Sequence, residues 1–166
     1  PEMISLAQAK NSSVDFQIND MRSFNLGKTF DLVLCTYDAL NYLLDEREIL
    51  STFSAVHAHL ADGGLFLFDV NTPLLYEAKH HGVIERELDG ISFRQELSYD
   101  PVKQIASATF VFEDGSQEEH IQRGYDQLSI SDLLRAASLM EIAVYMDTTG
   151  TMAEPDSQKL LFAAQK

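Results

Sequence analysis

Polar side chains able to bind a small molecule gather after three apolar runs of the sequence. The residues are Asn19, Asp20, Met21 and Arg22; Cys35, Thr36, Tyr37 and Asp38, with Asn41 and Tyr42; and Asp69, Asn71, Thr72 and Pro73. Parallel strands bring their carboxyl ends to one edge of a sheet, where ligands bind in open α/β folds. Carboxylate, amide and hydroxyl groups that converge there could orient a small molecule. The simpler alternative is that these residue types only form turns and helix caps.

The segments around these groups predict an α/β sheet. Helices are expected over residues 2–10 and 46–61, and strands over 14–18, 30–35 and 65–70. The run 30–35 is almost continuously apolar, which is typical of a strand covered on both faces. Asp62-Gly63-Gly64 is expected to end the second helix. Strand, helix, glycine turn and strand form a βαβ unit, which implies a parallel sheet.

The hydrophobic period changes near residue 83, where an antiparallel meander is expected. Its strands are residues 83–88, 91–99, 104–112 and 117–125, with turns at Asp89-Gly90, Asp100-Pro101 and Asp114-Gly115. A helix capped by Ser129 and Asp132 follows, and then closing strands over 142–146 and 160–164. We therefore predict an α/β core of residues 1–75 and 127–166, with 76–126 as an inserted antiparallel β subdomain.

Composition narrows the classes of function. The 166 residues include 12 Lys and Arg against 26 Asp and Glu, which gives a net charge of −14. Such a surface repels phosphate groups and argues against nucleic acid or an anionic membrane as a partner. No apolar run approaches the ~20 residues of a membrane span. The single cysteine, Cys35, excludes an internal disulfide and fits a cytoplasmic location.

The start of the chain is unusual for a complete protein. Pro1 stands in place of an initiator methionine, and helix-like residues follow it without a capping residue. This pattern favours a piece of a longer protein, or a chain whose front was removed by processing. The expected consequences are an exposed apolar sheet edge and either poor solubility or a homodimer across that edge.

Several stretches of the sequence follow the order and spacing of one enzyme family. They are Pro1–Ala7, Asn19–Phe24, Phe30–Cys35, Asp38–Leu43 and Leu60–Asn71. They resemble the helix after the ribose site, the adenine-side turn, the fourth strand, its following loop and the fifth strand of the class I S-adenosylmethionine-dependent methyltransferases. The resemblance is strongest to the small-molecule branch that carries a β insertion after the fifth strand.

The resemblance implies a Rossmann-like methyltransferase sheet with the inserted meander, truncated at its N-terminal end. The family's glycine-rich loop, which wraps the methionine part of the cofactor, has no counterpart, because no G-x-G occurs in the sequence. The acidic residue with which the family binds the ribose is also missing.

The resemblance further implies S-adenosylmethionine as cofactor and methyl transfer to a small molecule by in-line displacement, a reaction that depends mainly on proximity and alignment. By similarity, the residues expected at the cofactor are Asp20, Met21, Cys35, Thr36 and Tyr37. Asp20 would accept a hydrogen bond from the adenine amino group. The residues expected to face the substrate are Asp38, Asn41, Tyr42 and Asn71.

No catalytic residue is assigned and no metal site is expected. His120 in the meander is a candidate base, since histidine is the commonest general base. Cys35 is more simply a small core hydrophobe than a nucleophile.

His57 and His59 cannot share a helical face and so do not form a metal pair. Arg123 and Tyr125 share one face of a strand, and a solvated face is a simpler interpretation than a cleft.

Two other functions stay open. A truncated or degenerate methyltransferase fold could serve as a non-catalytic association module. A nicotinamide-binding dehydrogenase shares the sheet type but needs the same glycine fingerprint, which is absent.

Overall fold

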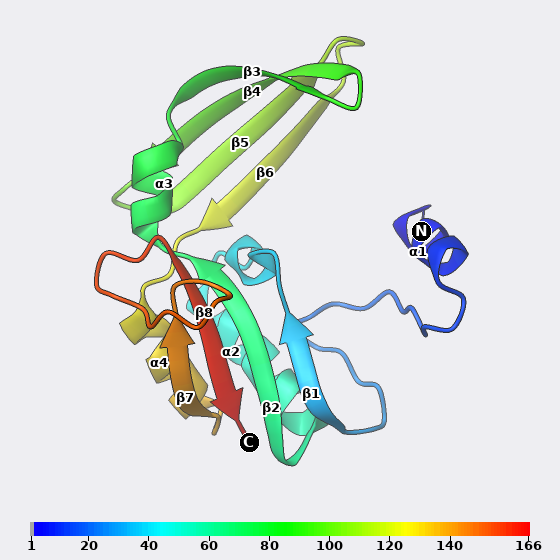
Figure 1. The fold of residues 1–166 in the computed structure, drawn as a ribbon, viewed down its shortest axis with the longest axis vertical. Coiled ribbons are helices and arrows are strands. Elements are labelled where there is room, and N and C mark those ends of the chain that lie inside the picture. Colours follow the sequence, from blue (N-terminus) through cyan, green and yellow to red (C-terminus); the bar gives the residue numbers. More distant parts are fainter. Residues whose placement is uncertain (1) are drawn as a thin grey trace.

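Two four-stranded sheets organise the protein, and Figure 1 shows one above the other. The computed structural model describes residues 2–166. The strands of the lower sheet, in spatial order, are β1 (Phe30–Cys35), β2 (Leu60–Asn71), β8 (Lys159–Gln165) and β7 (Met140–Tyr145). β1 and β2 are parallel, as the βαβ pattern predicted, while β8 runs antiparallel to both of its neighbours.

One face of the lower sheet is covered by α2 (Glu46–His59) and α4 (Gln127–Ala136). Phe53 of α2 packs against Phe66 and Phe68 of β2, with ring centroids 5.8 and 5.2 Å apart, and Phe68 stacks on Phe162 at 4.9 Å. The predicted end of α2 was wrong by two residues, because β2 begins at Leu60 and includes both glycines. No helix in residues 2–166 is both long and apolar enough to cross a bilayer.

The opposite face of the lower sheet is partly open. Leu32 and Leu34 of β1 are 48% and 59% exposed, so the prediction that this strand is covered on both faces was wrong. The expected helix α1 (Glu2–Lys10) is present, but it stands apart from the sheet in Figure 1. Residues 14–18 do not form the predicted strand, because they pair with no strand within residues 2–166.

The upper sheet is the predicted meander, with neighbours in chain order. Its strands are β3 (Gly82–Leu88), β4 (Ile91–Asp100), β5 (Ile105–Phe112) and β6 (Gln117–Arg123). Asp89 and Gly90 both have positive φ, 51° and 79°, as a tight hairpin turn requires. A helix that the sequence did not reveal, α3 (Pro73–Lys79), leads into this sheet. The cap of α4 is Asp126, which accepts the Ser129 N–H, and not the predicted Ser129.

A short 3-10 helix, η1 (Ala39–Tyr42), joins the two sheets. The fully buried Asn41 donates its amide to the carbonyl oxygens of Asn71 at 2.9 Å and Arg123 at 2.7 Å. Its side-chain oxygen accepts the N–H of Asn71 at 2.9 Å. Gly124 completes the junction, since a Cβ there would lie 2.7 Å from the nitrogen of Pro73. One carboxamide therefore ties η1 to the ends of β2 and β6.

We expect Asn41→Ala to lower the free energy of unfolding by about 3 kcal/mol, because it leaves buried backbone groups unpaired. Urea unfolding followed by circular dichroism measures the change. Asn11→Ala, in an exposed turn, is the matched control and should stay within about 0.5 kcal/mol of the parent. Equal stability of the two variants would contradict the bridging role of Asn41.

Candidate functional site

The turn after β1 has a strained backbone. Tyr37 and Asp38 lie consecutively in the left-handed region, with φ of 62° and 48°. Non-glycine residues keep this conformation only where surrounding contacts hold it, and such strain clusters at functional sites. Here Asp69 Oδ2 accepts the N–H of Asp38 at 3.0 Å, and Lys159 Nζ lies 2.7 Å from the same oxygen. The ends of β2 and β8 therefore fix the turn.

The Asp38 carboxylate connects this turn to the upper sheet. Gln122 of β6 donates its amide to Asp38 Oδ2 at 2.6 Å. Tyr76 of α3 in turn donates its hydroxyl to Gln122 Oε1 at 3.1 Å. On its other side, Asp38 Oδ1 lies 3.9 Å from Lys159 Nζ. Asp38 keeps 27% of its side chain exposed, so a ligand can still reach it.

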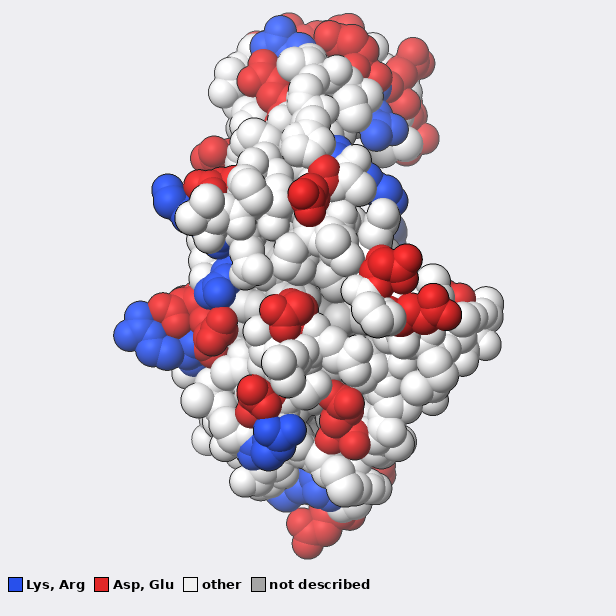
Figure 2. All heavy atoms as spheres, turned by 90° about the vertical axis from the view of Figure 1, so that its left-hand side faces the viewer, with Lys and Arg blue, Asp and Glu red and all other residues white. Residues whose placement is uncertain are grey.

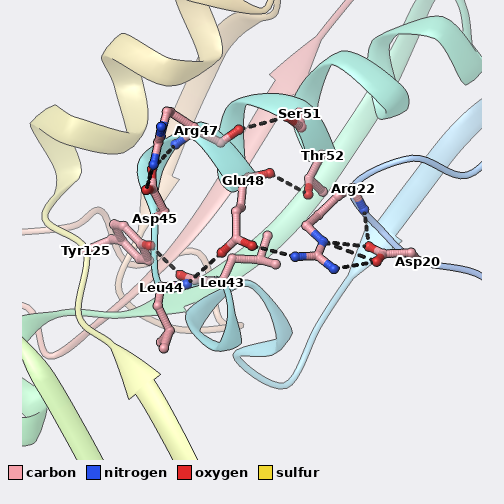
Figure 3. Close-up of polar contacts among 10 residues, drawn as sticks. All are labelled: Asp20, Arg22, Leu43, Leu44, Asp45, Arg47, Glu48, Ser51, Thr52 and Tyr125. Atoms are coloured by element: carbon pink, nitrogen blue, oxygen red, sulfur yellow. Dashed lines mark hydrogen bonds and ion pairs between the residues drawn. The ribbon is translucent and has the colours of Figure 1, made fainter.

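A second set of charges holds the turn at residues 19–22. Figure 3 shows Arg22 between two carboxylates, 2.6 Å from Asp20 Oδ2 and 2.5 Å from Glu48 Oε1. Side-chain and backbone hydrogen bonds from Arg22 lower the pKa of the Asp20 carboxyl to about 2. Asp20 is therefore ionised at neutral pH, and with 44% of its side chain exposed it can accept a further hydrogen bond.

Asp20 and Met21 line a hollow of about 430 Å³ together with Tyr42. The structure thus brings two predicted cofactor residues beside one predicted substrate residue. Met21 also lines an adjoining hollow of about 410 Å³ with Asn19 and Phe24. Met21 and Asn19 therefore line both hollows, and the second hollow extends to Phe30 at the start of β1.

Thr36 and Tyr37 line a different hollow, of about 510 Å³, with Asp69 and Lys159 at its polar end. Its apolar walls include Leu34, Leu67 and Leu161. By strand alternation, Leu67 faces away from the side of β2 that carries the buried Phe66 and Phe68. The structure therefore does not bring Thr36 and Tyr37 into one hollow with Asp20 and Met21.

Cys35 packs against the hydrophobic core at the end of β1. Burial, with a contribution from the Asp69 charge, raises the pKa of the Cys35 thiol to about 11. The thiol is therefore neutral at physiological pH, as expected of a small core side chain and not of a nucleophile.

Asn41 and Asn71 are buried and not open to a ligand, with 0% and 7% exposure. All the hydrogen bonds of the Asn41 carboxamide go to backbone, and Asn71 Nδ2 lies 3.4 Å from the hydroxyl of Tyr76. Both side chains support the junction between the sheets. Their contacts with a substrate stay predictions.

Two further side chains have structural roles. The interpretation of Tyr125 as part of a solvated strand face was wrong, because it is 1% exposed and donates its hydroxyl to the Leu43 carbonyl. The Tyr125 ring belongs to the hydrophobic core. The strand pattern alone did not show whether this residue would be buried or exposed. His59 is also buried, and its Nε2 accepts the Leu26 N–H at 2.9 Å.

Sequence reasoning missed Gln122, Tyr76 and Lys159 as members of the site. Gln122 and Tyr76 reach it only through the docking of the upper sheet and α3, which no local pattern specifies. Lys159 opposes Asn71 because β8 runs antiparallel to β2. A lysine directly before the final apolar run was the one signal available for it.

We expect Arg22→Gln to raise the pKa of the Asp20 carboxyl from about 2 toward the usual aspartate range, because the guanidinium stabilises the anion. A lowered folded-state pKa contributes stability that is present above the ordinary aspartate pKa and is lost as the pH falls through about 2. A carboxyl ¹³C NMR titration measures the change.

Arg135→Gln is the matched control, since it breaks a 2.7 Å ion pair with Asp132 on α4 and should leave Asp20 unchanged. An Asp20 carboxyl that still titrates at about 2 in Arg22→Gln would refute the assigned cause.

Sequence comparisons find relatives along almost the whole chain, although no family model matches it. "Putative methyltransferase YqeM" of Bacillus subtilis (strain 168) is 29% identical over 177 residues, covering 99% of this chain and 72% of that protein. "Putative methyltransferase GWCH70_2453" of Geobacillus sp. (strain WCH70) is likewise 29% identical, over 182 residues, with the same coverage.

Solved structures share the fold. An S-adenosylmethionine-dependent methyltransferase from Clostridium acetobutylicum ATCC 824 superposes with a TM-score of 0.88 at 24% identity, covering 99% of this chain and 71% of that one. The amino pentose methyltransferase CalS10 from Micromonospora echinaspora gives a TM-score of 0.73 at 23% identity, covering 99% and 70%. The Rossmann-like α/β prediction is confirmed: this chain has the fold of the class I S-adenosylmethionine-dependent methyltransferases, and its sequence relatives carry the name of methyltransferases.

Proposed function

We propose that the chain transfers a methyl group from S-adenosylmethionine to a small molecule. The observation that carries the proposal is the strained Tyr37–Asp38 turn at the carboxyl end of β1. In this fold it adjoins η1, whose Tyr42 shares a hollow with the ionised Asp20. Open α/β sheets bind ligands at this edge, so the strain is stored where a cofactor would lie.

The chemistry of these side chains fits the cofactor. S-adenosylmethionine supplies an electrophilic methyl group on a cationic sulfonium. Asp20 is ionised and exposed enough to accept from an adenine amino group, and Met21 offers an apolar contact beside it. We propose that Cys35, Thr36 and Tyr37 contact the same cofactor from the end of β1, although Thr36 and Tyr37 line a separate hollow in the structure. The carboxylates of Asp38 and Asp69 supply the negative charge that a cation favours.

We propose a small amine as the methyl acceptor, facing Asp38 and Tyr42. A 68-residue stretch, 41% of the chain, is 25% identical to a dTDP-3-amino-3,6-dideoxy-alpha-D-glucopyranose N,N-dimethyltransferase of Streptomyces fradiae. The net charge of −14 also suits a cationic acceptor. Figure 2 shows acidic groups spread over one face from end to end, without an extended basic patch. Asn41 and Asn71 would act there by holding the turn in place.

The proposal also assigns roles to the two parts of the chain, an oligomeric state and a location. Residues 1–75 and 127–166 form the catalytic core, and 76–126 form a subdomain above the acceptor. β1 is an outer strand of the lower sheet, and its Leu32 and Leu34 are exposed. Both features support a homodimer across the β1 edge. The single cysteine supports a cytoplasmic location.

Calorimetric titration with S-adenosylhomocysteine tests the proposal. We expect saturable binding with a dissociation constant of about 1 mM or tighter. Asp20→Ala should weaken it about tenfold, because a charge-assisted hydrogen bond contributes about 1.5–3 kcal/mol.

Asp114→Ala, in the turn between β5 and β6, is the matched control and should bind like the parent. A parent chain without saturable binding would contradict the proposal and favour the non-catalytic association module. Equal affinity of Asp20→Ala and the parent would remove Asp20 from the site.

A further inference from the structure

The two sheets also meet through a pair of side chains that the sequence did not link. The hydroxyl of Tyr42, at the end of η1, lies 2.7 Å from Nδ1 of His120 on β6. Their ring centroids are 5.9 Å apart at 63°. The imidazole also packs edge-on against Phe110 of β5, at 5.2 Å and 72°. His120 is therefore held between two aromatic rings with one nitrogen directed at Tyr42.

The other nitrogen of His120 indicates which atom holds the proton. Nε2 lies 3.9 Å from Glu118 Oε2, two residues earlier on the same face of β6. A protonated Nε2 faces this carboxylate favourably, whereas a lone pair there would oppose its negative charge. Nδ1 is then unprotonated and accepts the hydrogen bond from Tyr42. The order of groups is Glu118, His120, Tyr42, leading toward the hollow that Tyr42 lines.

The surroundings of Tyr42 disfavour a free phenolate. Burial, together with the charge of Asp38, raises the pKa of the Tyr42 hydroxyl. The other groups that carry or can acquire charge around this pair are Asp20, Arg22 and Glu48 at the hollow, Tyr76 from α3, and Glu118 from β6. Tyr42 can take a proton from a ligand only if it passes its own proton to another base, and His120 is in contact to receive it.

The nearby carboxylates are engaged elsewhere. Asp20 is paired with Arg22, Asp69 with Lys159, and Asp38 accepts from Gln122. In Asp20 the contacts with Arg22 lower the carboxyl pKa to about 2, which makes it a weak base. An amine that enters as its cation must lose a proton before it can attack, and an amine that gains a methyl group has one to release.

We propose that Tyr42 and His120 form the proton-accepting pair for the methyl acceptor, an assignment that rests on the function proposed above. The acceptor nitrogen forms its bond to the methyl carbon, and the electron pair of the broken methyl–sulfur bond stays on the sulfur. The nitrogen's proton passes to the Tyr42 oxygen while the Tyr42 proton passes to Nδ1 of His120. The resulting imidazolium faces Glu118 and returns its proton to solvent. Tyr42 is the catalytic residue, and His120 and Glu118 act through it.

The tautomer can be tested without cofactor or acceptor. In the chain labelled with ¹⁵N-histidine, we expect His120 to show a protonated Nε2 and an unprotonated, hydrogen-bonded Nδ1 at neutral pH. Tyr42→Phe should shift the Nδ1 resonance, because its donor is removed. His57→Asn, on α2, is the matched control and should leave both His120 resonances unchanged. A protonated Nδ1, or no response to Tyr42→Phe, would overturn the pair.

The pH profile of turnover tests the role of the pair. With methyl-labelled S-adenosylmethionine and glucosamine, ethanolamine and other small primary amines as probes, kcat of the parent should rise with pH as the proton-accepting pair becomes free to take up a proton. His120→Asn should abolish that rise, and Tyr42→Phe should lower kcat ~100-fold. Glu118→Gln should move the midpoint of the rise, which a merely structural role would not do.

The outcomes separate the two claims. A parent chain that transfers methyl groups, with variants at Tyr42 and His120 that match its kcat and pH profile, would overturn the pair and leave the proposed function standing. A parent chain that neither binds S-adenosylhomocysteine nor transfers methyl groups would overturn the function and, with it, the role assigned to the pair.

Discussion

The carboxamide of Asn41 is the contact on which the arrangement of the two sheets depends. It is fully buried and binds backbone groups of Asn71 and Arg123, the last residues of β2 and β6. A buried polar side chain that both donates and accepts hydrogen bonds at these backbone groups fixes a geometry more sharply than apolar packing does. The turn after β1, η1 and the end of β6 are thereby held in one place.

The site inherits its shape from this junction. With η1 held, Asp38 meets Gln122 and Tyr42 meets His120, so these two residues each have a partner on β6. The second sheet is therefore not only an appendage above the core. Through β6 it supplies groups that orient the side chains which we propose face the acceptor, and Gln122 adds a contact to the Asp38 carboxylate in the strained turn that Asp69 and Lys159 hold.

The sequence predicted the parts of this structure that local patterns encode. The βαβ unit, the meander and its Asp89-Gly90 turn all follow from apolar periodicity and turn chemistry. Residues 14–18 alternate like a strand but lack a partner to pair with, and Tyr125 reads as surface although it enters the core. The polar links to Gln122, His120 and Lys159 depend on how separate elements dock, which no local pattern records.

The central claim is that the edge of the lower sheet and β6 respond to the cofactor as one site. Amide chemical-shift mapping during addition of S-adenosylhomocysteine tests it most directly. We predict perturbed amides at residues 19–22 and 35–38, continuing across the junction to His120 and Gln122. Perturbations that stop at the lower sheet, or that centre on the separate hollow between α4 and β7 at Ser131 and Glu141, would contradict the account.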